Sequence, residues 1–137
     1  MKIHISFVTL LIMIFILTSC NEEINVYTYF DKKNPFNLKF YSTDSLTKFT
    51  NLRQLKILPN DNIYSNLTKW IDNNKTGWQD APASYVPDVG IEQGTFHLLY
   101  LKKANGIVIN FIDPKNIAKQ YSKSVKKGEL DFLYEAK

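Results

Sequence analysis

Cysteine and histidine, which supply many of the nucleophiles, general bases and metal ligands of proteins, are scarce in this chain. The 137 residues contain one cysteine, Cys20, and two histidines, His4 and His97. No disulfide can form within the chain, so packing has to stabilise the fold. The hydrophobic content of 45% and the aromatic content of 14% are sufficient for such a core.

Motifs for nucleotide binding and nucleophilic catalysis are also absent. The sequence has no Walker loop, no Gly-rich dinucleotide fingerprint and no Gly-x-Ser-x-Gly elbow. His97 and scattered acids do not give zinc spacing, and Asn60-Asp61-Asn62 fits a helix cap better than a calcium loop. We therefore expect no cofactor, no metal and no catalytic residue, and we interpret His97 as a packed or edge histidine.

Strong charge of either sign is lacking as well. The formal net charge is +4 at pH 7, and lysine outnumbers arginine 16 to 1. Residues 1–19 hold Lys2 and no acid, so the charge without them is +3. An excess this small does not indicate nucleic-acid binding, and we expect none.

One long apolar run is present, at the N-terminus. Residues 5–17 contain no charge, proline or glycine, Lys2 precedes them, and the small Thr18 and Ser19 follow. A membrane-spanning helix needs about 20 apolar residues, so this run is short for that role. A positive start, an apolar middle and small residues at the end are typical of a secretory signal peptide.

Leu17-Thr18-Ser19-Cys20 resembles the lipobox of bacterial lipoprotein precursors. The resemblance implies a diacylglycerol thioether on Cys20, cleavage before it, and acylation (for example with palmitate) of the new amino group. Residues 1–19 would then be the signal peptide and residues 20–23 the lipidated cysteine and a short tether. A signal anchor or an ordinary signal peptide with a chance cysteine is the alternative.

The resemblance also gives an expected location, the bacterial cell envelope, with the chain anchored to a membrane through Cys20. Asn21-Glu22-Glu23 is similar to the acidic stretch that follows the lipidated cysteine in some surface-exported lipoproteins. The outer membrane or the cell surface is therefore favoured.

Residues 24–137 are long enough for one globular domain and too short for two. The β-branched and aromatic content of residues 24–30 and the alternation in residues 36–41 predict two strands, which could form a hairpin. Residues 53–58 are a third expected strand, and residues 43–50 are either a helical turn or a loop. Apolar residues at helical spacing predict a helix from Asn60 or Asp61 to residues 72–75.

Residues 95–102 and 107–112 are the strongest strand pair in the sequence. Asn105-Gly106 favours a two-residue type I′ turn, which would place Tyr100 opposite Phe111 and Lys102 opposite Ile109. Both strands are apolar on both faces, so we expect them to be central and covered.

Asp113-Pro114 resembles a helix N-cap and first helical residue, and it predicts a second helix that ends at Gly128. Its expected buried stripe consists of Ile117, Ala118, Tyr121 and Val125. Residues 130–134 are expected to form a short last strand or a docked tail. The element order predicts an α+β fold, with a small mixed or antiparallel sheet and two packed helices.

The long connection at residues 73–94 is the first candidate binding surface. Trp78 and Tyr85, with Asp80 and Asp88 nearby, could form a recognition patch, because aromatic side chains on a fixed loop give contact area at low entropy cost. The alternative is that Trp78 and Tyr85 close the core beside Trp70.

The second candidate is a basic face of the expected last helix. Four lysines recur at nearly every fourth position: Lys115, Lys119, Lys123 and Lys126. They could bind anionic lipid headgroups or an acidic partner, or they could only solvate the helix.

The function that the sequence favours is a lipid-anchored, non-enzymatic envelope protein that binds a protein partner, for example an immunity or inhibitor protein. An envelope-polymer hydrolase that uses two loop carboxylates is one alternative. The acids available for it are Asp72, Asp80, Asp88 and Glu92. A structural lipoprotein without a discrete site is the other alternative.

Overall fold

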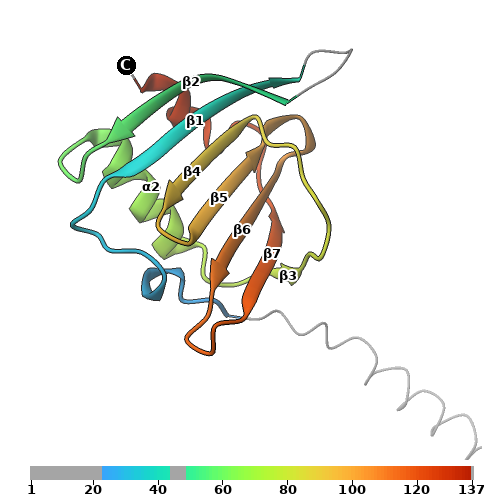
Figure 1. The fold of residues 1–137 in the computed structure, drawn as a ribbon. Helices are drawn as coiled ribbons and strands as arrows, with labels where there is room; N and C mark the ends of the chain where they lie inside the picture. The colour runs from blue at the N-terminus through green and yellow to red at the C-terminus, as the bar shows by residue number, and fades with distance from the viewer. Residues whose placement is uncertain (1–22, 44–48, 137) are drawn as a thin grey trace, which may run out of the picture.

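The computed structural model describes residues 23–43 and 49–136, and their strands form one antiparallel sheet (Figure 1). The strand order is β2-β1-β4-β5-β6-β7-β3. The strands are β1 (Phe36–Thr43), β2 (Phe49–Ile57), β3 (Gln79–Asp80), β4 (Val89–Gln93), β5 (Phe96–Leu101), β6 (Gly106–Ile112) and β7 (Ala118–Ser124). The helix is α2 (Asn62–Asn73), and the short 3-10 helices are η1 (Val26–Thr28), η2 (Lys102–Ala104) and η3 (Asp131–Glu135). The α+β prediction and the antiparallel sheet are confirmed, but the described residues contain one α-helix instead of two.

The sheet has one face that packs on the core. A row of buried apolar side chains crosses five neighbouring strands on this face: Leu38, Ile91, Leu98, Ile109 and Tyr121. Side chains alternate between the two faces of a strand, so every second residue contributes to this core. Helix α2 covers the face from behind in Figure 1 and buries Leu67, Trp70 and Ile71 against it. We call the opposite side of the sheet the outer face.

Helix α2 matches the sequence prediction. Asp61 is its N-cap residue and Asn74 its C-cap residue, within the expected boundaries. The Asp61 carboxylate accepts a hydrogen bond from the backbone N–H of Leu58 at 2.6 Å, so it fixes the turn that leads into the helix. The strands predicted at residues 36–41 and 53–58 are also confirmed, as β1 and β2.

The prediction of a strand at residues 24–30 is wrong. Val26–Thr28 form the 3-10 helix η1, and β1 pairs with β2 and β4 instead. The Tyr27 hydroxyl donates to the Thr68 carbonyl oxygen of α2, and Phe30 packs against Phe36 and Phe96 with ring centroids 5.0 and 5.2 Å apart. Tertiary aromatic contacts therefore override the local β propensity of this segment.

The prediction of a second helix after Asp113 is also wrong, because residues 118–124 form strand β7. Asp113 caps a tight turn: its Oδ1 accepts hydrogen bonds from the backbone N–H groups of Lys115 at 2.9 Å and Ile117 at 2.8 Å. Strand β7 then pairs with β6 over seven residues, which satisfies the backbone of β6 on that side. In the expected buried stripe, only Tyr121 is buried, whereas Ile117 is half exposed.

The β5–β6 pair is confirmed, but its predicted register is wrong. Tyr100 pairs with Ile107 instead of Phe111, because η2 and the left-handed Asn105 (φ 48°) replace the two-residue turn. The register differs from the prediction by four residues. A shift by an even number leaves every side chain on its expected face. The strand order places β5 and β6 in the interior of the sheet, as predicted.

The C-terminal segment is a docked tail, one of its two expected forms. Leu130, the N-cap residue of η3, and Leu133 within η3 are both fully buried. The Tyr100 hydroxyl donates a 3.2 Å hydrogen bond to Asp131 Oδ1 and thereby joins the centre of the sheet to this tail.

This contact predicts a loss of stability at alkaline pH. Burial, and then the nearby Asp131 carboxylate, raise the pKa of Tyr100 from 10.0 to about 12. Because the folded state favours the neutral phenol, its stabilisation is complete below pH 10 and is lost as the pH rises from 10 to about 12. Urea unfolding across this range should show the decline, and Tyr100→Phe should reduce its slope. An equal slope in both proteins would contradict the assignment to Tyr100.

Candidate functional site

Trp78 belongs to the core and not to a surface patch. Its side chain is 1% exposed, its ring meets Trp70 edge-on with centroids 6.5 Å apart, and its Nε1 donates to the Asn74 carbonyl oxygen at 2.7 Å. The structure therefore places Trp78 in the alternative role, closing the core beside Trp70. Its predicted part in direct recognition is wrong.

Within the long connection, residues 81–88 are the irregular segment between β3 and β4. Gln120 lies on the outer face of β7, and its Nε2 donates to the carbonyl oxygens of Ala81 and, at 2.6 Å, Ala83. At the other end, Asp88 donates its N–H to Tyr100 O at 2.9 Å. Both ends are thus fixed to the sheet, and the segment leads from the β3 edge to the start of β4 (Figure 1).

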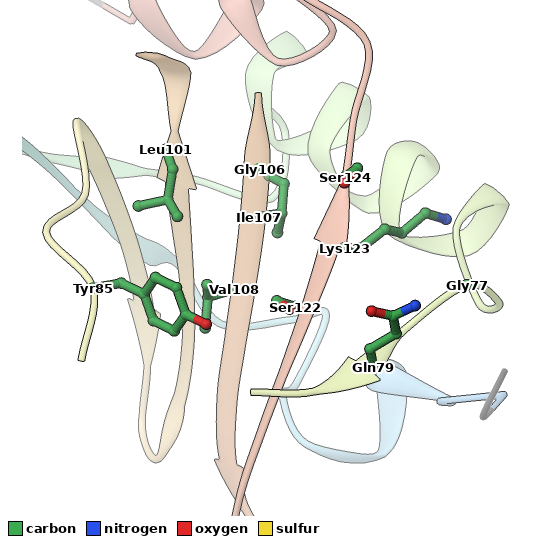
Figure 2. A pocket seen from close by; sticks show the side chains of 10 residues that line it. All are labelled: Gly77, Gln79, Tyr85, Leu101, Gly106, Ile107, Val108, Ser122, Lys123 and Ser124. Carbon is green, nitrogen blue, oxygen red and sulfur yellow. The ribbon is translucent and has the colours of Figure 1, made fainter. Parts of the chain in front are cut away.

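Tyr85 and Val86 stand at the middle of this fixed segment. The Val86 side chain is 57% exposed, the highest value among the exposed large apolar residues of the described chain. Tyr85 is partly buried, and Figure 2 shows its ring directed over the sheet near Val108. Val108 faces outward from β6 but is 0% exposed, so the segment and its neighbours shield the centre of the outer face at this point.

Two hollows lie beside Tyr85, and both are also lined by Leu101. One, of about 380 Å³, reaches across β6 and β7 to Gln79 of β3 (Figure 2). The other, of about 310 Å³, lies between the segment, Tyr41 and Lys103. We call Tyr85, Val86 and Leu101, with these two hollows, the loop surface.

Gly90 allows Tyr41 to pack at the margin of the loop surface. A Cβ atom on Gly90 would lie 3.1 Å from Cε2 of the Tyr41 ring, which is closer than nine in ten natural Cβ contacts. Burial raises the pKa of Tyr41 above its ordinary value, so its hydroxyl is neutral at physiological pH. The loop surface thus combines apolar and phenolic side chains with Lys103 at one margin.

The acids proposed for hydrolysis do not form a catalytic pair. Asp80 lies on β3, four strands away from Glu92 on β4, which corresponds to about 19 Å across a sheet. Asp88 and Glu92 are four residues apart along the same strand region, about 13 Å. Asp72 lies on α2, behind the core face, in an ion pair with Lys75. Glycosidase carboxyls stand about 5 to 9.5 Å apart, so the geometry does not support this alternative.

A row of polar side chains crosses the outer face, and it was not predicted. It runs through five neighbouring strands as Asn37, Glu92, His97, Asn110 and Gln120. Glu92 Oε2 accepts from Lys39 Nζ at 2.6 Å, and Glu92 Oε1 lies 3.7 Å from His97 Nδ1. The row contains no hydroxyl or thiol, so it supplies His97 with a carboxylate but with no nucleophile. The cross-strand register creates this row, and the register could not be read from the sequence.

The four lysines of the expected basic helix do not share a face. Lys119 and Lys123 project from β7, whereas Lys115 lies in the β6–β7 turn and Lys126 follows β7. Lys123 Nζ donates to Asn74 Oδ1 and to the Thr76 carbonyl oxygen, both at 2.8 Å, and burial lowers its pKa. Lys123 is therefore a structural residue, and the helical basic face is a wrong prediction.

The described residues hold no group of three or more potential metal ligands. None of their helices is long and apolar enough to cross a membrane. The signal peptide and Cys20 lie outside the described residues, so these predictions remain expectations.

We compared the chain with protein families, with curated proteins and with solved structures. None of the three comparisons finds a match. Any functional assignment therefore has to come from the chemistry of this chain.

Proposed function

We propose that this protein is a lipid-anchored component of the bacterial cell envelope that binds a protein partner, without catalysis, through the loop surface. The lipobox resemblance at Cys20 supports the anchor, and the similarity of Asn21-Glu22-Glu23 to the acidic stretch of surface-exported lipoproteins favours the outer membrane or cell surface. The observation that carries the binding role is the exposure of Val86 on a segment whose two ends are fixed to the sheet.

The physical argument is one of preorganisation. Covering an exposed apolar side chain with a partner lowers the free energy of the complex, and a segment that is already ordered loses little entropy on binding. Tyr85 and Leu101 extend the apolar area beside Val86, and the two hollows can receive side chains of a partner. This arrangement fits an apolar centre with a polar rim, which is the usual anatomy of a protein interface.

An immunity or inhibitor protein that neutralises an incoming toxin is one class within this proposal. Such a protein needs an anchor, a stable domain and one recognition surface, and it needs no catalytic set. This assignment rests on analogy with small lipoproteins of that kind and not on a contact in the structure.

Val86→Asp is the variant that tests the loop surface. A carboxylate at the centre of an apolar contact would be desolvated on binding, so we expect recovery of the partner to fall by about tenfold or more. The measurement is a quantitative pull-down from detergent-solubilised membranes, with the thermal unfolding of each variant recorded in parallel.

Leu58→Asp is the matched control for that experiment. Leu58 is 45% exposed, follows β2 and lines neither hollow of the loop surface. We expect it to retain the partner. If Val86→Asp and Leu58→Asp recover the same proteins in the same amounts, the loop surface is not the binding site.

A further inference from the structure

The turn between β6 and β7 has an unusual composition for a solvent-exposed turn. Ile112 is 37% exposed and Ile117 is 50% exposed at its two ends, and the exposed Lys115 stands between them. Two of the five large apolar residues exposed on the described chain thus lie in one six-residue stretch. Apolar and basic side chains together are typical of segments that lie in the membrane interface.

The turn is also rigid. Besides the two hydrogen bonds to its carboxylate, Asp113 donates its N–H to Ile117 O at 2.9 Å, and Asn116 donates to Asp113 O at 2.9 Å. Asn116 adopts a left-handed conformation (φ 61°), which asparagine tolerates well. The exposure of Ile117 is therefore built into the turn and does not result from a loose loop.

The turn lies next to the N-terminal end of the domain. Glu23, Ile24 and Asn25 line one hollow of about 470 Å³ together with Asp113, Pro114, Lys115 and Lys119. The N–H of Ile24 donates to Lys75 O at 2.8 Å, and Tyr29 stacks on Phe111 with ring centroids 3.7 Å apart. Both contacts fix the first residues of the domain beside the turn, as the arrangement in Figure 1 also shows.

The tether limits how far this end of the molecule can stand from the anchor. Three peptide units join Cys20 to Glu23, and a fully extended chain of that length spans about 11 Å. If Cys20 carries acyl chains, Glu23 lies within that distance of the lipidated residue, and the turn lies beside Glu23.

We propose that the β6–β7 turn, together with the first residues of β7 (residues 112–119), docks on the glycerophospholipid headgroups of the bilayer that holds the anchor. Ile117 and Ile112 enter the boundary between headgroups and acyl chains, and Lys115 and Lys119 lie at the phosphate groups. Among the described residues, Asp113 and Glu23 are the acids that line the same hollow. The Asp113 carboxylate accepts hydrogen bonds from backbone amides of the turn. Glu23 is the last residue of the tether and lines the same hollow as the turn.

This inference deepens the proposed function, because it rests on the anchor at Cys20 and gives the domain an orientation. Strand β6 runs from Gly106, at the loop surface, to Ile112, at the turn, a length of about 20 Å. Docking of the turn therefore directs the loop surface away from the bilayer, where a partner can reach it.

The test uses the lipidated full chain in vesicles of phosphatidylethanolamine and phosphatidylglycerol. Lipidation occupies the thiol of Cys20, so Ile117→Cys provides a single site for an environment-sensitive fluorophore. Val86→Cys, on a similarly exposed apolar residue at the loop surface (57% against 50% for Ile117), is the matched control. We expect nitroxide-labelled lipids to quench the label at position 117 at least about twofold more than the label at position 86.

The outcomes separate docking from anchoring. If both labelled proteins sediment with the vesicles but are quenched equally, the docking proposal is overturned and the anchor is retained. If neither protein sediments, the anchor fails and the docking proposal fails with it. Lys115→Gln with Lys119→Gln, introduced into the Ile117→Cys chain, should reduce quenching in these anionic vesicles if the lysines lie at the phosphates. Unchanged quenching would remove the two lysines from the proposal.

Discussion

Trp78→Ala should lower the free energy of unfolding by about 3 to 5 kcal/mol, the cost of removing a fully buried large aromatic side chain. Trp78 is 1% exposed, and its ring fills the space beside Trp70. The substitution also leaves the carbonyl oxygen of Asn74 without its indole donor. Urea unfolding followed by circular dichroism measures the change.

Val86→Ala is the matched substitution for this prediction. It removes an apolar side chain that is largely exposed, so we expect a change within about 0.5 kcal/mol. If Trp78→Ala and Val86→Ala cost the same, the ring of Trp78 is not a core residue. A loss of partner binding in Trp78→Ala therefore reports on folding, whereas a loss in Val86→Asp reports on the interface.

Cys20→Ser should abolish lipid attachment altogether. The attaching enzyme needs a thiol to form the thioether, and a serine hydroxyl does not replace it. Two or more acyl chains give stable membrane binding, so their loss should move the protein to the soluble fraction or leave an unprocessed precursor. Metabolic labelling with a radioactive fatty acid, together with fractionation of the cells, measures both effects.

Ser19→Ala is the control for that substitution. Alanine is a common residue at this place of the lipobox that the sequence resembles, so the variant should be labelled as well as the wild type or better. Fatty-acid label that persists in Cys20→Ser would contradict lipidation at this residue.

The elements with the strongest local patterns are the ones that the sequence predicts well. Helix α2 has apolar residues at helical spacing and a capping aspartate before it, and strands β5 and β6 carry long apolar runs. Each of these patterns is local, so it can be recognised in the sequence without knowledge of the tertiary contacts.

The two wrong secondary-structure predictions share one physical origin, which is contact with other elements of the fold. The sequence after Asp113 has a helix-like start, yet the edge of β6 offers seven residues of backbone that β7 can pair with. Residues 24–30 have strand-like composition, yet Tyr27 and Phe30 find partners on α2, β1 and β5. In both segments, contacts with other strands and helices outweigh the local sequence pattern.

The candidate site was predicted in part. The sequence singles out the long connection, but its pattern does not tell which aromatic residue turns inward; Trp78 is buried, and Tyr85 is only partly buried. The polar row through His97 depends on the register of five strands. The closeness of the β6–β7 turn to Glu23 depends on the fold of the whole domain.

The anchor at Cys20 is the claim on which location, orientation and partner access all depend. Mass spectrometry of the N-terminal peptide, taken from the protein extracted from membranes, tests it most directly. We expect a peptide that begins at Cys20 and carries a diacylglycerol thioether and, where the amino group is acylated, a further acyl chain. A peptide that retains residues before Cys20, or a Cys20 thiol that is free to react with maleimide, would contradict the account.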